Sequence, residues 1–177
     1  MNQDSSVNGV YYHKKDYAGL VRRVVIALID MTVVLFILML AASMSFMIDP
    51  EEKKFDQILF YSALILSYLY LVLLKRSLGT PGYWLTGVRI VDLSGNRPSV
   101  IRMTGRFLWL IVSPLSLGFD LVWLTSEETR QTLRDKIVGT YVIKKKVLPA
   151  GSGRQTIKVL SVMGLYLRLR EVERSKG

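Results

Sequence analysis

A single acidic side chain interrupts the first long apolar run of this chain. The run extends from Val24 to Ile48, and Asp30 is its only charged residue. A carboxylate inside a lipid bilayer costs at least about 2.5–3.5 kcal/mol unless it is protonated or paired. Asp30 is therefore a candidate for proton or cation exchange. The alternative is a structural aspartate that joins helices. The shallow position of Asp30, about 9 Å into the helix, favours this second interpretation.

An arginine shares a helical face with Asp30. Arg23 precedes it by seven residues, which places both side chains on one face but about 10.5 Å apart along the helix axis. Because this separation is too long for a direct ion pair, each side chain needs a partner on another segment. For Asp30 we expect Arg102, Arg106 or Arg134. For Arg23 we expect Asp120 or Asp135.

Asp120 is a second acid among apolar residues, and it is a candidate to join Asp30 in a proton or cation site. Carboxylates and hydroxyls suit hard cations such as Na⁺. Four serines near these segments supply hydroxyl groups: Ser62, Ser67, Ser113 and Ser116. The alternative, which we favour, is that Asp120 lies at the membrane interface or caps a half-helix.

The residue types that are rare or missing exclude most enzyme classes. The chain of 177 residues has no cysteine and one histidine, which excludes disulfides, thiol catalysis and histidine or cysteine metal clusters. No nucleophile–base pair and no cofactor fingerprint is visible. The sequence therefore predicts no enzyme, no metal site and no cofactor.

Two apolar runs are long enough to cross a bilayer. A spanning helix needs about 20 mainly apolar residues, and Val24 to Ile48 exceeds this length without a polar stripe. The second run, Ile58 to Leu74, carries no charge and ends abruptly at Lys75 and Arg76. The sequence predicts a helical hairpin over about 22–48 and 56–75. A signal peptide fits poorly, because the first run is too long and no cleavage pattern follows it.

The basic residues give the hairpin an orientation. Lysine and arginine precede the first run and follow the second, whereas the connection 49–56 carries four acids and two lysines. Positive flanks face the cytoplasm, so both ends of the hairpin are expected inside. The net charge of +10 then fits anionic lipid headgroups, against which we place the run Lys144 to Lys146, and it does not require nucleic acid.

A third hydrophobic stretch, about 102–125, has two interpretations. Its apolar part, Phe107 to Thr125, is long enough to span. Pro114 and Gly118 break its middle, and the chain beyond it is strongly basic, which opposes translocation. We therefore favour a segment that folds back over one that crosses.

Short β elements are expected on the cytoplasmic side. Residues 87–100 indicate a strand and turn, and 139–146 another strand, so the two are expected to pair. Residues 150–153 read as a flexible linker. The tail 156–172 suits either a strand hairpin or a helix on the membrane surface. The predicted fold is an all-α membrane protein with a small cytoplasmic β element.

Three motifs in order resemble the RDD family of bacterial membrane proteins. They are YAGLVRRVVIALID (17–30), GTPGYWLTGVRIVDLSGNRPS (79–99) followed by Arg106, and RQTLRDKIVGTYVIKK (130–145). The resemblance maps the arginine and two aspartates of the family onto Arg23, Asp30 and Asp135. Arg106, Arg134 and Asp120 are supporting candidates from the residues themselves. The chain departs from the family at Tyr83, where a lysine is usual, and at Arg134, where histidine or glycine is common.

The resemblance implies a bacterial inner-membrane protein whose relatives are suggested to transport unidentified ligands, with sodium/proton exchange proposed for some. We divide the chain into a cytoplasmic tail (1–16), a membrane domain (17–146) and a basic extension (147–177). Two functions stay open. The first is a small transporter or cation-coupled carrier, which must oligomerise because two or three helices cannot enclose a pathway. The second is an accessory subunit or scaffold of a larger membrane complex.

Overall fold

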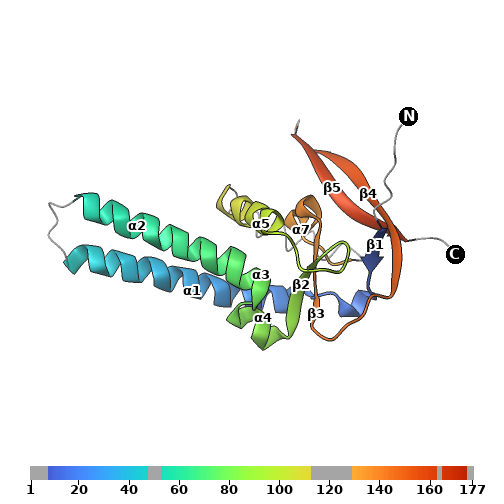
Figure 1. Ribbon diagram of the computed structural model, residues 1–177, viewed down its shortest axis with the longest axis horizontal. Coiled ribbons are helices and arrows are strands. Elements are labelled where there is room, and N and C mark those ends of the chain that lie inside the picture. Colours follow the sequence, from blue (N-terminus) through green and yellow to red (C-terminus); the bar gives the residue numbers. More distant parts are fainter. Residues whose placement is uncertain (1–7, 48–52, 113–128, 163–164, 175–177) are drawn as a thin grey trace.

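Two long antiparallel helices dominate the computed structural model, which describes residues 8–47, 53–112, 129–162 and 165–174. Helix α1 covers Leu20–Met47, and α2 covers Lys53–Tyr68. The second helix continues through a π-helical turn, η2 (Leu69–Leu74), into the short α3 (Lys75–Ser77). Figure 1 shows this hairpin extending away from all the other described elements.

The outer half of the hairpin exposes its apolar side chains. Buried residues of α1 are confined to Arg23, Ile26 and Asp30, all near its start. The exposed side chains farther along include Leu35, Phe36, Met39, Leu40 and Phe46. Both Leu20–Met47 and the helical stretch Lys54–Thr86 are long and apolar enough to cross a membrane. A large apolar surface of this kind requires lipid or another protein to cover it.

A compact base gathers at the inner end of the hairpin. Helix α4 (Pro81–Thr86) follows a turn at Gly79, whose φ of +83° favours glycine. Strand β2 (Val88–Asp92) then pairs antiparallel with β3 (Thr140–Lys144). These are the two strands that the sequence predicts as a small sheet, and the structure confirms their pairing.

Helices α5 (Val100–Val112) and α7 (Leu133–Val138) complete the base. Helix α5 packs against the π turn and α7. It contains the first part of the third hydrophobic stretch. Whether that stretch spans or folds back is decided by residues 113–128, including Pro114, Gly118 and Asp120, which lie outside the described residues.

The predicted all-α class is wrong, because a second sheet is present. Its strands are β1 (Asn8–Tyr11), β4 (Gly151–Val162) and β5 (Leu165–Arg174), in the order β1-β4-β5 and all antiparallel. The tail 156–172 is thus a strand hairpin, one of its two predicted forms. The alternation of apolar and polar residues in this tail follows the period of a strand.

The glycines predicted as a linker are strand residues. Gly151 and Gly153 of β4 pair with β1, in the segment predicted as a cytoplasmic tail. A Cβ on Gly153 would overlap the carbonyl oxygen of Glu173. Glycine is used there for close approach of two backbones, a property that composition alone does not separate from flexibility.

Two apolar clusters hold the base together. One joins α1, the π turn and β2–β3 around Ile26, Val72 and Tyr83. The other lies between the two sheets, where the rings of Tyr12, Tyr17 and Tyr141 meet edge to face. Together they fix the start of α1 against β3.

Candidate functional site

A fully buried carboxylate lies at the centre of the base. Asp135 accepts a hydrogen bond from Arg23 Nη1 at 2.6 Å on Oδ2, and Arg106 Nη1 donates to its Oδ1. Arg106 also donates to Thr140 Oγ1 at 2.7 Å. A buried carboxylate held by two guanidinium groups is charge-assisted and geometrically fixed.

The start of α7 places Asp135. Thr132 is the N-cap of this helix, and its side chain accepts from the Asp135 backbone while Asp135 accepts from the Thr132 backbone, a capping box. The capping box therefore fixes the carboxylate within its own helix, in addition to the bonds from the two arginines. Gln131 adds a bond from Nε2 to the Thr140 carbonyl oxygen at 3.0 Å, which joins the helix start to β3.

Arg23 ties the start of α1 to this helix. Besides Asp135, its guanidinium donates to the carbonyl oxygens of Ala18 at 3.3 Å and Arg130 at 2.8 Å. Arg130 has a φ of +44°, in the left-handed region that residues other than glycine rarely adopt. One arginine thus joins two segments that are distant in sequence, the start of α1 and residues 130–135.

The structure contains one of the two ion pairs predicted for Arg23, the pair with Asp135. The partner predicted for Asp30 is wrong. Lys75 Nζ lies 2.5 Å from Asp30 Oδ2, and the Tyr70 hydroxyl donates to Oδ1 at 3.0 Å. Of the predicted arginines, Arg106 binds Asp135 and Arg102 lies 3.4 Å from Asp92.

The π turn explains why Lys75 and Tyr70 reach the same carboxylate. The Lys75 backbone N–H donates to the Tyr70 carbonyl oxygen, five residues back. Such an i to i+5 bond stacks residues five apart over each other, whereas a regular α-helix stacks residues three or four apart. The wider turn therefore presents both side chains to Asp30. Periodicity based on an α-helix does not reveal this, which is why sequence reasoning missed both residues.

Close packing of α4 against α1 encloses Asp30 on its other side. A Cβ added to Gly82 would lie 3.0 Å from Ile26 Cα and 3.4 Å from Asp30 Oδ1. Tyr83, the next residue, places its ring 5.0 Å from the Lys75 ammonium, a cation–π contact. The tyrosine that departs from the family pattern therefore contacts the partner of Asp30.

A cavity of about 100 Å³ lies beside the Asp30–Lys75 pair. Its charged lining consists of Arg23, Asp30, Lys75, Arg106 and Arg134. The remaining walls are mainly apolar side chains of α1, the π turn and α5. The space is large enough for a few water molecules, so Asp30 combines a charged partner, a hydroxyl donor and a cavity with charged and apolar walls within an apolar hairpin.

The serines predicted to surround a cation do not gather around Asp30. Ser67 Oγ is buried and donates to the Ala63 carbonyl oxygen within its own helix, and Ser62 is exposed. Ser113, Ser116 and Asp120 lie outside the described residues. In the part of the chain that the structure describes, the polar contacts of Asp30 come from Lys75 and Tyr70.

The C-terminal hairpin joins the site through a second ion-pair group. Lys136, buried on α7 beside Asp135, donates to Glu171 of β5, and Lys158 of β4 lies 2.7 Å from the same carboxylate. Burial raises the pKa of Glu171, but the hydrogen bonds from the two lysines outweigh it and hold the pKa below its usual 4.5. The second sheet is therefore attached to the helix that carries Asp135.

The sequence matches the RDD family over residues 17–139. The chain belongs to the RDD family. No curated protein and no solved structure is significantly similar to it. The matched region contains Arg23, Asp30 and Asp135 and, with the two apolar helices, indicates a membrane protein.

Proposed function

We propose that this RDD-family protein is a non-enzymatic, multi-pass carrier of the bacterial inner membrane, coupled to a cation, with Asp30 as the exchanging carboxylate. The observation that carries the proposal is the Asp30–Lys75 pair beside a cavity that is lined by charged and apolar side chains within the apolar hairpin. Ionisable residues at membrane depth are functional candidates by default, and proton relays use acids of this kind.

The chemistry follows from competition for one carboxylate. A proton or a hard cation that reaches Asp30 through the cavity replaces the Lys75 ammonium as its counter-charge. The charge-assisted bonds of Lys75 and Tyr70 to this carboxylate then weaken, and with them the contact between α1 and the π turn. Binding of the cation is in this way linked to a change in helix packing, which a carrier requires.

We assign the base of the hairpin to the cytoplasm, with both termini on that side. The support is the excess of lysine and arginine beside the inner ends of the two helices over the connection 49–56. Strands β1, β4 and β5 also share one sheet at that end of the hairpin (Figure 1). The exposed apolar outer half supports assembly of several copies, since one hairpin cannot enclose a pathway.

Flux measurements in liposomes test the carrier. We expect a Na⁺ or K⁺ gradient to drive proton movement, read by an enclosed pH dye, in vesicles with the wild-type protein and not with Asp30→Asn. The control is Asp56→Asn, which makes the same change on α2 far from the cavity and should keep the flux. Equal flux from wild type and Asp30→Asn would contradict the proposal.

A double variant separates transport from folding. Asp30→Asn alone leaves the half-buried Lys75 without its counter-charge, which destabilises the fold. Asp30→Asn combined with Lys75→Gln removes both charges and should recover much of the unfolding temperature. A purely structural aspartate predicts that the double variant regains its function with its stability. The carrier predicts a stable protein that moves no protons.

An accessory subunit is the second candidate, and the outer face of the β4–β5 hairpin favours it. Ile157, Val159 and Tyr166 are exposed, and the strand register places them on one face with Arg168 and Arg170. An exposed apolar face of this kind suits contact with a partner. Val159→Asp should then release a co-purified partner at fixed stoichiometry, while no ion flux is detected from any variant.

A further inference from the structure

We propose that a basic hollow at the inner end of the second helix binds the phosphate of an anionic phospholipid from the adjacent leaflet. The hollow has a volume of about 350 Å³ and lies between the end of the second helix, β2 and the turn that follows β2. It is separate in function from the Asp30 cavity, although Lys75 lines both. The binding of a lipid here is independent of any transport.

Charge is the first argument. Five cationic side chains from four segments line the hollow: Arg76, Arg89, Arg97, Lys145 and Lys75, the last with its ammonium paired to Asp30. Among the described residues that line it, none is acidic. Like charges gathered in one concave surface repel each other and attract a multivalent anion. Basic pockets at the cytoplasmic ends of membrane helices bind anionic lipid headgroups for this reason.

The guanidinium groups are directed by the backbone. Arg76 Nε donates to the Pro98 carbonyl oxygen at 2.6 Å, and Arg89 Nη2 donates to the Val147 carbonyl oxygen at 3.2 Å. Each bond leaves other N–H groups of the same guanidinium for an anion, since arginine carries five donors. Arginines fixed in this way are better suited to phosphate than mobile surface lysines.

The surroundings of the hollow favour a lipid over a soluble phosphate. Leu78, Trp84 and Leu85 are exposed next to it, and Trp84 Nε1 donates to the Leu78 carbonyl oxygen at 2.8 Å. Tryptophan and aliphatic side chains of this kind lie at membrane interfaces. A phosphate in the hollow would thus lie at headgroup depth, with its acyl chains along the exposed apolar surface of α2.

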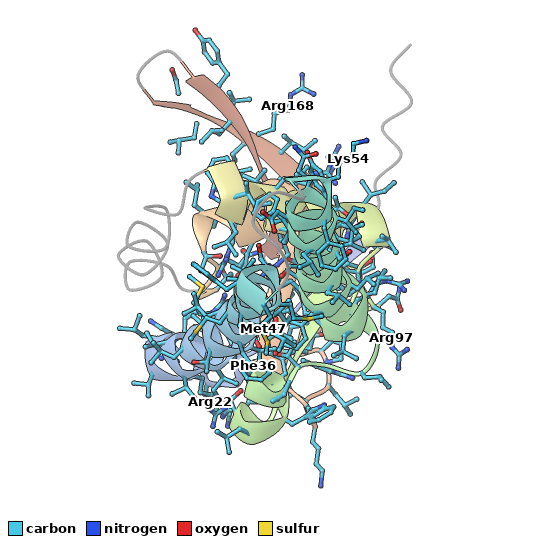
Figure 2. All side chains as sticks on the ribbon, turned by 90° about the vertical axis from the view of Figure 1, so that its left-hand side faces the viewer. Arg22, Phe36, Met47, Lys54, Arg97 and Arg168 are labelled. Carbon is cyan, nitrogen blue, oxygen red and sulfur yellow. The ribbon has the colours of Figure 1, made fainter. Side chains whose placement is uncertain are left out.

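The position of other cations provides a matched control. Arg22 is half-buried on α1, and Figure 2 shows it on the opposite side of the molecule from Arg97. Lys14, in the 3-10 turn Lys14–Asp16 before α1, is exposed. Neither residue lines the hollow. Removing these two charges changes the net charge as much as removing Arg97 and Lys145, but leaves the hollow intact.

Native mass spectrometry of the full chain in detergent, titrated with phosphatidylglycerol, phosphatidylcholine or inorganic phosphate, tests the proposal. We expect phosphatidylglycerol to bind at least about tenfold more tightly than phosphatidylcholine. Arg97→Gln with Lys145→Gln, both exposed positions that are expected to fold normally, should weaken it about 25-fold, at about fivefold per charge. Arg22→Gln with Lys14→Gln should retain it.

Three results would overturn the assignment. Equal binding of the two lipids would show that the charge of the hollow is not used. An equal loss of phosphatidylglycerol binding in the control variant, Arg22→Gln with Lys14→Gln, would show that binding depends on net charge and not on the hollow. Binding of inorganic phosphate as tight as that of phosphatidylglycerol would assign the hollow to a soluble anion instead of a lipid.

Discussion

The two halves of the α1–α2 hairpin differ in what holds them. Beyond Asp30, α1 carries no charge and exposes one large apolar side chain after another. At the inner end, α1 contacts α4 closely and uses Arg23 and Asp30 in buried ion pairs. The outer half therefore depends on its surroundings for stability, and the inner half depends on specific partners within the chain.

This difference separates two kinds of sequence information. The outer half requires only an apolar composition, because almost any apolar side chain is compatible with the lipid around it. The inner half needs exact residues at exact positions, because a buried charge without its partner destabilises the fold by several kcal/mol. Substitutions in the inner half should consequently lower the free energy of unfolding much more than substitutions in the outer half.

The largest effect is expected at Asp135. Asp135→Asn leaves Arg23 and Arg106 buried with no carboxylate and weakens the capping box of α7, so the free energy of unfolding should fall by about 3–5 kcal/mol. Chemical denaturation in detergent micelles measures this. Asp56→Asn, the same change in the outer half, should alter stability by less than about 0.5 kcal/mol. Similar values for the two variants would remove the contrast.

A smaller loss is expected from Gly82→Ala. The new Cβ would lie 3.0 Å from the Ile26 Cα and 3.2 Å from its carbonyl oxygen, so α4 must move outward from α1. Overpacking of this kind costs about 1–3 kcal/mol. Thermal unfolding measures the loss.

Gly87→Ala is not a suitable control because Gly87 has a φ of +64°. Thr86→Ala, on the same helix, is preferable, and a larger loss there would contradict the packing argument.

The C-terminal hairpin should respond weakly to pH. The folded pKa of Glu171 is held below 4.5 by Lys136 and Lys158, so its contribution is present above the unfolded pKa and is lost as the pH falls through the folded pKa. Because the group is partly exposed, we expect about 1 kcal/mol or less. The difference in unfolding temperature between wild type and Glu171→Gln should shrink between pH 6 and pH 3. Glu173→Gln serves as the control, and an unchanged difference would contradict the assignment.

The smallest effect is expected in the outer half. Phe36 is exposed to its surroundings, so Phe36→Ala should change the free energy of unfolding in detergent by less than about 0.5 kcal/mol. Ile26→Ala, in the buried cluster of the base, should cost about 2–4 kcal/mol. A comparable loss at Phe36 would contradict the contrast between the two halves. A changed oligomeric mass by light scattering would instead place Phe36 in the contact between copies that the proposed carrier needs.

The sequence predicted the elements better than the contacts between them. The hairpin follows from hydropathy alone, and the β2–β3 pair follows from alternation and turn residues. The pair of Arg23 with Asp135 could be predicted from the sequence as one of two alternatives, the other being a pair with Asp120. The partners of Asp30 could not be predicted, because a π turn changes the helix face on which Tyr70 and Lys75 lie, and no residue type predicts such a turn.

The second sheet was missed for a different reason. Its outer strand β1 is short and contains no strong alternation, and the glycines of β4 have the composition of a linker. What holds them is a long-range pairing between residues about 145 positions apart. A local pattern cannot report such a contact, so the sequence alone does not show that strands of the N-terminal tail and of the C-terminal extension share one sheet.

The π turn of the second helix carries a consequence for chain length. It holds one residue more than a regular helix needs for the same advance, so removing one residue between Leu69 and Leu74 would restore an unbroken α-helix. The segment after it would then keep its orientation, because the π turn accommodates the extra residue, whereas the side chains inside the turn, Tyr70 among them, would be redistributed around the helix. A relative whose second helix is one residue shorter here is expected to keep the cation at the end of the helix against its aspartate but to lose the phenol contact.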